Sequence, residues 1–292
     1  MFWQQLVNGL TTGSTYSLVA LGYTLIMGVL DIINMAHGEV FMFGAFIGLV
    51  FITYLHQNIF VAMLGAALTG VLLGLILEMV ALRPLRRKAV SSLAPLISTI
   101  GMSIFLESLA LRIFGPQSRA FPPTFSAIYK LGPLTISLVQ IIILVISFSL
   151  MVVLRFWLNK TKMGKALRAT AENIETANLL GVNTNRMIVL TISLASGLGA
   201  IAGVLVGLSV NAVEPTMGVS IGLKGLAVLI LGGLGNITGA MFGGLILGIA
   251  EVFTVAYGAS SYRDAVAFGI IILILFLRPQ GLFGASVKRG GR

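Results

Sequence analysis

Residues 59–82 read IFVAMLGAALTGVLLGLILEMVAL and contain one charged side chain, Glu78. A helix needs about 20 apolar residues to cross a hydrocarbon core of roughly 30 Å, and this stretch is long enough to do so. Backbone N–H and C=O groups find no water inside a bilayer, so a helix, which pairs them internally, is the expected conformation. The stretch therefore predicts a transmembrane helix.

The rest of the chain has the same character. Of the 292 residues, 57% are hydrophobic and 10% are charged, against roughly 45–50% and about 25% in soluble domains. Further apolar blocks that predict spans lie at 5–29, 92–113, 134–156, 187–210, 237–256 and 263–278. Two more, 39–55 and 221–235, are short and interrupted by glycine, which favours tilted, broken or re-entrant helices. We predict an all-α integral membrane protein, a polytopic bundle of about eight or nine transmembrane helices with broken or re-entrant segments.

The positive charge of the chain indicates its orientation. A net charge of +10 would suggest nucleic-acid binding in a soluble protein. Here the basic residues lie between apolar blocks, within 83–88, 155–186 and 278–292, as they do in the cytoplasmic loops of membrane proteins. All three clusters fall on one side if nine segments cross. We predict an N-terminus outside, a C-terminus in the cytoplasm, and no nucleic-acid partner.

Several kinds of chemistry are absent from the sequence. The chain has no cysteine, which excludes disulfides and thiolate metal sites. It has no Gly-x-x-x-x-Gly-Lys-Ser/Thr loop to hold the phosphates of a nucleotide, and no recognisable nucleophile–base pair or set of metal ligands. We predict that the chain is not an enzyme, has no catalytic residue, and binds no metal or cofactor of its own.

The longest polar loop between predicted spans covers about 157–186. Its centre, residues 164–181, is rich in Ala, Leu, Glu, Lys and Arg, which favour a helix, and Gly181 is a plausible stop at its end. A short amphipathic helix is expected there. It either lies on the membrane surface, with its basic flank attracted to anionic lipid, or fits a groove on a cytoplasmic partner.

Polar side chains near or inside the spans are candidates for a translocation pathway, because they are costly in lipid. They are Asn34, His37, Glu39, Asn236 and Glu251. A faint similarity between residues 33–39 and 234–240 indicates either a repeat with interrupted helices along a path or a chance likeness of glycine-rich segments. Glu251 lies in an otherwise apolar span, where it either pairs with another chain or lines the path. For Lys224 we expect the ammonium to extend to the membrane interface.

Four segments resemble the permease subunits of branched-chain amino acid ABC importers. In chain order they read LDIINMAHGE (30–39), MGKALRATAENIETANLLGVN (163–183), GGLGNITGA (232–240) and LRPQGLFG (277–284). The second resembles the loop by which these permeases engage their ATPases. The residues that the resemblance assigns to coupling are Gly164, Lys165, Ala166, Arg168, Ala169, Glu172, Asn173, Ala177 and Gly181. One departure is Lys165, where the family commonly has an arginine whose planar fork a lysine lacks.

The resemblance implies an assembly in the bacterial cytoplasmic (inner) membrane. This chain would be a single permease domain, 1–292, paired with a second homologous permease subunit as a heterodimer. Two ABC ATPase subunits would bind ATP and magnesium, and an extracytoplasmic substrate-binding protein would deliver leucine, isoleucine or valine. Two alternatives stay open: an ABC permease for urea or short amides, and a stand-alone secondary transporter or channel. The scarcity of acidic residues within the spans argues against proton coupling in the latter.

Overall fold

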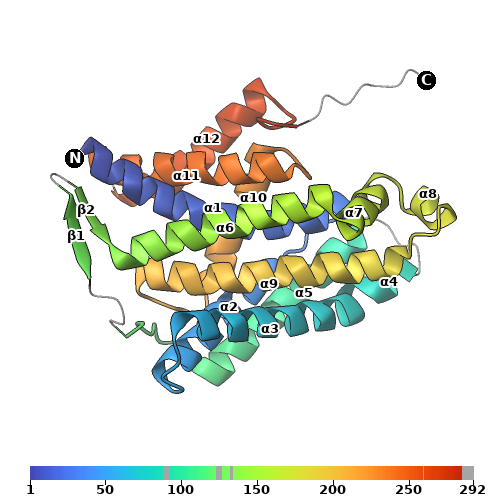
Figure 1. The fold of residues 1–292 in the computed structure, drawn as a ribbon, viewed down its shortest axis with the longest axis horizontal. Coiled ribbons are helices and arrows are strands. Elements are labelled where there is room, and N and C mark those ends of the chain that lie inside the picture. The colour runs from blue at the N-terminus through green and yellow to red at the C-terminus, as the bar shows by residue number, and fades with distance from the viewer. Residues whose placement is uncertain (88–92, 123–126, 132–133, 259, 285–292) are drawn as a thin grey trace.

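The fold is a bundle of long helices that run side by side (Figure 1). The computed structural model describes residues 1–87, 93–122, 127–131, 134–258 and 260–284. Within this part of the chain, six helical stretches are long and apolar enough to cross a membrane. They are α1 (Phe2–Leu30), the stretch Ile59–Arg86, α5 (Leu93–Phe114), α6 (Leu138–Lys160), α9 (Thr184–Val210) and α11 (Ile237–Tyr257). The predicted all-α polytopic fold is confirmed.

Shorter elements complete the bundle. The stretch from residue 59 consists of α3 (Ile59–Leu77), the π-turn η1 (Glu78–Leu82) and α4 (Arg83–Arg87). The short apolar helices are α2 (His37–Thr53), α10 (Met217–Gly232) and, after the turn η2 (Ser260–Tyr262), α12 (Arg263–Leu277). With 15 residues, α12 is shorter than a helix that crosses the whole core without help from tilt or thinning.

Two triplets of helices share one arrangement. Both α1–α3 and α9–α11 consist of a long helix, a short helix and another long helix. The main partner of α1 is α11, and the main partner of α9 is α3. Figure 1 shows α1 and α9 running in opposite directions, so the triplets have inverted orientations. The turn before α2 thus corresponds to residues 211–216 before α10, and not to residues 234–240 as the faint sequence similarity suggested.

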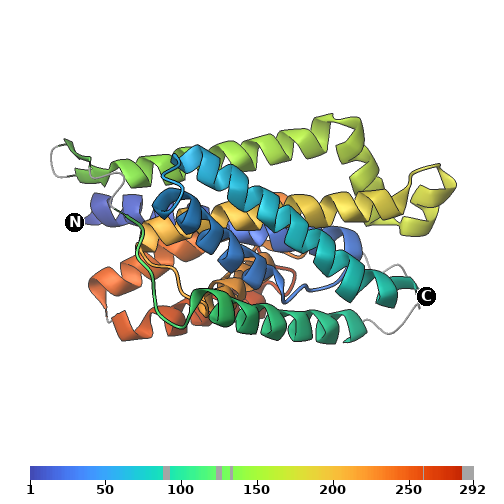
Figure 2. The same cartoon turned by 90° about the horizontal axis from the view of Figure 1, so that it is seen from below.

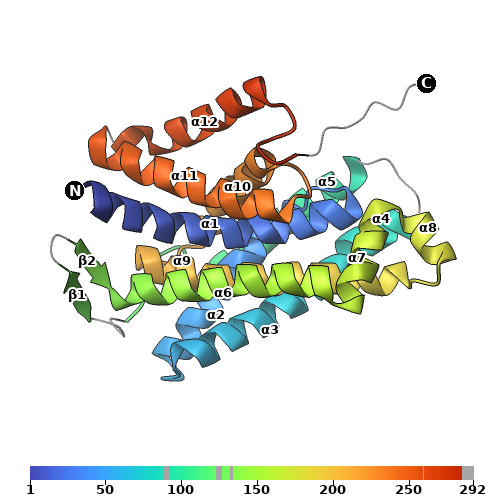
Figure 3. The same ribbon diagram turned by 45° about the horizontal axis from the view of Figure 1, so that its top comes forward.

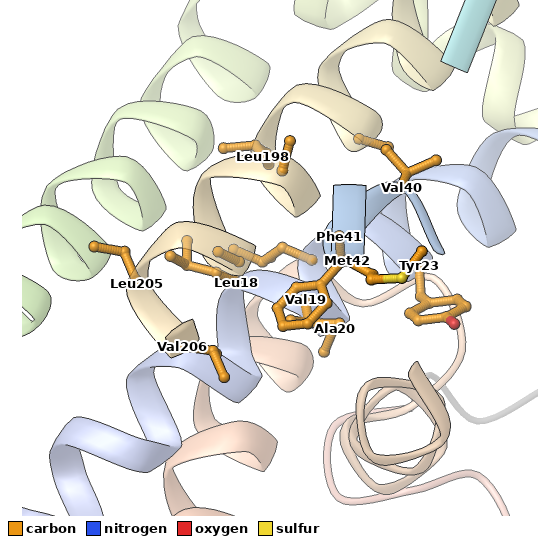
Figure 4. Close-up of a cluster of buried hydrophobic side chains, with 14 of the residues drawn as sticks. Leu18, Val19, Ala20, Tyr23, Val40, Phe41, Met42, Leu198, Leu205 and Val206 are labelled. Carbon is orange, nitrogen blue, oxygen red and sulfur yellow. The ribbon is translucent and has the colours of Figure 1, made fainter. Parts of the chain in front are cut away.

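The core forms where α1, α2 and α9 meet (Figure 4). Leu18 of α1, Phe41 of α2 and Leu205 of α9 are fully buried there. The outer helices cover this core from opposite sides, with α5 on one face and α6 on the other (Figure 2). Lipid-facing side chains of these outer helices are apolar and exposed, which fits a bilayer environment.

One predicted span begins too early. The span at 134–156 was expected to start at Leu134, but residues Leu134–Ser137 form strand β2, which pairs antiparallel with β1 (Ile128–Leu131). Helix α6 starts only at Leu138, because Ser137 and Gln140 form a capping box that satisfies free N–H groups at its N-terminus. The hairpin lies at the same end of the bundle as the N-terminus (Figure 1).

The contact of α1 with α11 predicts a strong effect of added side-chain volume. A Cβ on Gly248 would collide with the backbone N and Cα of Gly13, so Gly248→Val should force the two backbones apart. Overpacking of this kind costs about 1–3 kcal/mol, and we expect a lower thermal midpoint in detergent. Gly269→Ala on α12, where open space surrounds the glycine, is the control, and equal midpoints for the two variants would contradict this packing.

Candidate functional site

Helix α2 begins deep inside the bundle at His37. Its imidazole is fully buried and packs edge-on against the ring of Tyr23, with 4.7 Å between ring centroids. Added Cβ atoms on Gly22 of α1 and Gly199 of α9 would both collide with this imidazole. His37 therefore fills a space that two glycines leave open, next to the core of the protein.

Asn34 shapes the turn that precedes α2. Its Oδ1 accepts a hydrogen bond of 3.1 Å from the Ala36 N–H, and its backbone oxygen accepts one of 3.2 Å from the His37 N–H. The Met35 N–H donates to Thr99 Oγ1 of α5 at 3.2 Å. In this structure Asn34 fixes the start of α2, and its predicted place in a pathway stays a prediction.

Glu39 lies in the first turn of α2 and is fully buried. Its Oε1 accepts a hydrogen bond of 3.2 Å from Ser103 Oγ of α5. Its other oxygen, Oε2, has no hydrogen-bond partner among the described residues and lies beside Gly218, in the first turn of α10. Two helix N-termini and a serine of a third helix thus surround one carboxylate, and nothing in the sequence linked Ser103 to Glu39.

Asn236 lies at the opposite end of α10. Its Oδ1 caps α11 by accepting from the Gly239 N–H at 2.9 Å, and its Nδ2 donates to the backbone oxygen of Phe283 at 2.6 Å. The Leu282 N–H also donates to the Leu231 oxygen, at 2.8 Å. Asn236 thus joins two of the four motifs, GGLGNITGA and LRPQGLFG, which lie against each other.

Glu251 is the centre of a network of charges inside the bundle. Its Oε2 accepts from Tyr16 OH at 2.7 Å and pairs with Arg263 Nη2 at 3.0 Å, and its Oε1 pairs with Lys224 Nζ. Lys224 also pairs with Asp264 Oδ1 at 2.8 Å. Four helices, α1, α10, α11 and α12, are held together by this network, in which Glu251 pairs within its own chain.

The expectation for Lys224 was wrong. Its side chain is 11% exposed and ends in two ion pairs, so its ammonium does not extend to the membrane interface. The partners on α11 and α12 neutralise the charge, which burial in a bilayer requires. The adjacent Arg263 and Asp264, between two apolar blocks, were the available sequence signal for this network.

The predicted coupling loop leaves the bundle through a sharp reversal. Thr161 caps α7 (Lys162–Glu172) by accepting from the Gly164 N–H at 3.0 Å. Gly164 is buried, and a Cβ there would collide with the backbone of Leu158 in α6. Glycine therefore allows α7 to fold back against the end of α6, and α7 also packs on α1 and α9.

The loop contains two helices, where one across 164–181 was expected. Asn173 ends α7, and its Oδ1 accepts from the Thr176 N–H at 2.8 Å to start α8 (Ile174–Leu179). An asparagine side chain that caps a helix competes with helix continuation, which explains the break. Gly181 follows α8 with a φ of +83°, so the predicted stop is in place.

Helix α8 projects beyond the end of the bundle (Figure 1). Its Ala177 is buried, while Leu179 at its end and Leu180 just after it are 87% and 76% exposed. On α7, Ala166 and Ala169 are half-buried, and the charged side chains Lys165, Arg168 and Glu172 are exposed. A groove of about 550 Å³ lies between the end of α1 and the junction of α7 with α8, and residues 234–235 line its edge. The surface offers apolar, basic and acidic groups together.

Comparisons with known proteins agree with this geometry. Residues 5–275 match the family model described as branched-chain amino acid transport system / permease component. The chain belongs to this family. It is 40% identical to the high-affinity branched-chain amino acid transport system permease protein BraD of Pseudomonas aeruginosa, over 97% of this chain and 96% of that protein.

Two further relatives of this permease cover a similar length. The high-affinity branched-chain amino acid transport system permease protein LivH of Escherichia coli K12 is 38% identical, over 97% of this chain and 96% of its own. The probable branched-chain amino acid transport permease protein LivH of Methanocaldococcus jannaschii is 28% identical, over 93% and 89%. A search of the solved structures finds no match. The chain is a multi-pass membrane transport protein.

The charge network of the permease predicts a stability test. Glu251→Leu would remove the buried anion that pairs with both Lys224 and Arg263, and would leave the exposed Asp264 as the remaining anionic partner of Lys224 in the described structure. Removal of one partner from a buried pair costs about 3–5 kcal/mol, so we expect a marked drop in the thermal midpoint in detergent. The double variant Glu251→Leu, Lys224→Met removes both buried charges and should regain part of the loss. A double variant no more stable than Glu251→Leu would argue against the pairing.

Proposed function

We propose that this chain is a permease subunit of an ATP-binding-cassette importer that moves leucine, isoleucine and valine into the bacterial cytoplasm. It would work with a second, homologous permease chain, two ATPase subunits that bind ATP and magnesium, and an extracytoplasmic binding protein. The observation that carries the proposal is the geometry of α7 and α8. One helix is anchored against three spans, and the other extends from the bundle with exposed leucines.

The exposed leucines of α8 support a protein partner over a lipid surface. A helix that lies on a membrane keeps its apolar face against the bilayer, whereas α8 lies beyond the end of the bundle (Figure 3) and its Leu179 is exposed there. Leu179 and Leu180 would insert into a groove of an ATPase, as an amphipathic helix does. Arg168 and Glu172, both exposed on α7, would fix the orientation.

Movement of α8 has a direct route to the membrane spans. Helix α8 contacts α7 and α9, and α7 contacts α1, α6 and α9. The spans α1 and α9 in turn enclose the buried start of α2, through Gly22 and Gly199. Closure of the ATPases would therefore move α1 and α9, which surround the buried N-terminus of α2. Alternating access follows if this movement opens the path to one side of the membrane and closes it to the other.

The basic residues support an orientation with α8 in the cytoplasm. Arg155, Lys160 and Lys165 lie at the end of the bundle from which α8 projects, as the excess of positive charge in cytoplasmic loops requires. The N-terminus and the hairpin lie at the other end and would face outward. Lys88, Lys288, Arg289 and Arg292 lie outside the described residues.

The test is ATP-dependent leucine uptake into liposomes that contain this chain with its second permease, ATPase and binding-protein partners. The double variant Leu179→Ala, Leu180→Ala removes two exposed side chains, so the fold should persist. Uptake should fall at least about tenfold, because loss of two leucines from a buried interface costs more than about 1.4 kcal/mol of binding free energy. Val152→Ala, on the exposed face of α6, is the matched control and should transport normally.

The same assay separates the alternatives. Uptake by this chain without ATPases would identify a secondary transporter or channel. If urea or a short amide abolishes ATP-dependent leucine uptake by competing for the binding protein, the cargo is assigned to that class of solute and the ABC mechanism is retained. Normal leucine uptake by the double leucine variant would show that α8 does not couple the ATPases to transport.

A further inference from the structure

The N-termini of α2 and α10 meet near the middle of the membrane. A Cβ on Gly38 would collide with the backbone oxygen of Gly218, and Gly222 lies against the Gly38 backbone. The depth follows from α9, whose Gly199 packs on His37 and lies 11 residues before its outer end at Val210. At 1.5 Å per residue this places the meeting point ~16 Å below that end, about half of the thickness of a hydrocarbon core.

At this depth Glu39 has no cationic partner among the residues that the structure describes. Its Oε2 has no hydrogen-bond partner, and no Lys, Arg or His nitrogen of the described chain lies within 4.0 Å of it. Glu107, a second acidic residue, lies one turn beyond Ser103 on α5. A buried carboxylate in a membrane is ordinarily paired, and the partner that fits this one is a cationic group from outside the chain.

A small cavity borders Ser103 and Gly218, the two residues that lie against the Glu39 carboxylate. It measures about 40 Å³, and Ser103 and Tyr23 form its polar part while Met35, Leu223 and Leu226 form its apolar part. A water-sized group needs roughly 10–15 Å³ of such space. The cavity therefore has room for an ammonium group but not for a whole leucine, whose aliphatic side chain would lie outside it, over the exposed Val219 and Leu223.

The first turn of α10 offers the complementary charge. Its N-cap residue, Thr216, makes no side-chain hydrogen bond to the free N–H groups that follow. The first N–H groups of a helix carry a partial positive charge and bind anions such as carboxylates. A carboxylate acceptor and an uncapped helix start, side by side, match the two charges of a zwitterion.

The segment that leads into α10 is partly exposed. Residues 211–216 descend from the outer end of α9 to the start of α10 without forming a helix, and Asn211, Glu214 and Thr216 are exposed along the way. Non-helical backbone at membrane depth is tolerated only where protein or water covers it. The face is therefore not a lipid-facing surface, and a second permease chain would cover it.

We propose that Glu39, Ser103 and the first turn of α10 form half of a binding site that holds an aliphatic α-amino acid midway across the membrane. Glu39 accepts hydrogen bonds from the ammonium group, the N–H groups of α10 donate to the carboxylate, and Val219 and Leu223 contact the side chain. The facing permease chain completes the site. This inference rests on the proposed import of branched-chain amino acids and adds the residues that hold them in transit.

The experiment uses the complete transporter in liposomes and a leucine analogue that carries a diazirine on its side chain. After illumination during ATP turnover, we expect adducts on residues 219–226 of α10 or 97–106 of α5 in the wild type. Glu39→Gln keeps the volume and the hydrogen bond to Ser103 but removes the charge. It should reduce these adducts and the uptake of leucine at least about tenfold, as expected for loss of a charge-assisted hydrogen bond.

Two serines provide a matched pair of milder variants. Ser103→Ala removes a hydrogen-bond donor to Glu39 and should lower uptake several-fold. Ser147→Ala alters a fully buried hydroxyl of α6 that has no described hydrogen-bond partner and should transport normally. Assembly of each variant with the ATPases is measured by size-exclusion chromatography. If Glu39→Gln does not assemble, the positions of the wild-type adducts and the uptake of the two serine variants test the half-site instead.

The outcomes separate this inference from the proposed function. A wild-type transporter without ATP-dependent leucine uptake would refute the proposed function itself. A wild type that imports leucine but forms adducts only elsewhere would refute the half-site alone, as would an assembled Glu39→Gln variant with normal uptake and labelling.

Discussion

Backbone contact between helices at glycine is the interaction on which this structure depends. In a bilayer, apolar side chains gain little by leaving lipid for protein, so helices associate through close van der Waals packing. Gly248 on Gly13, Gly203 on the Phe41 oxygen and Gly38 on the Gly218 oxygen bring backbones into direct contact. These contacts join α1 to α11, α9 to α2 and α2 to α10. The short helices keep their positions because α1 and α9 close around them.

Two of the three glutamates buried in the described part of the chain, Glu251 and Glu39, show how position decides the role of one residue type. Glu251 has a phenol and two cationic groups around it, so its charge is balanced within the chain and fastens four helices together. Glu39 is equally buried but has one serine donor and no cation within the described structure. The first is a structural group, and the second has unused capacity for a ligand.

Local features of the fold were predictable from the sequence, and distant pairings were not. Apolar blocks such as 59–82 predict spans because length and hydropathy are local properties, and Gly181 was a recognisable helix stop. The strand Leu134–Ser137 was missed because its apolar residues continue into those of α6. The break at Asn173 depends on the side chain capping a new helix. The partners of Lys224, on α11 and α12, lie 27 and 40 residues further along the chain, and Ser103 lies 64 residues from Glu39, beyond what periodicity can indicate.

The non-helical segment 211–216, between α9 and α10, has a consequence for how much of this chain a cell can accommodate in its membrane. A lone copy in the membrane would present non-helical backbone and the exposed Glu214 to hydrocarbon, at a cost of several kcal/mol for each unsatisfied group. A bound neighbour, or water in a pore, removes that cost. If the proposed second permease chain supplies the cover, surplus copies of this chain lack it, and the synthesis of the two chains would have to be matched in number.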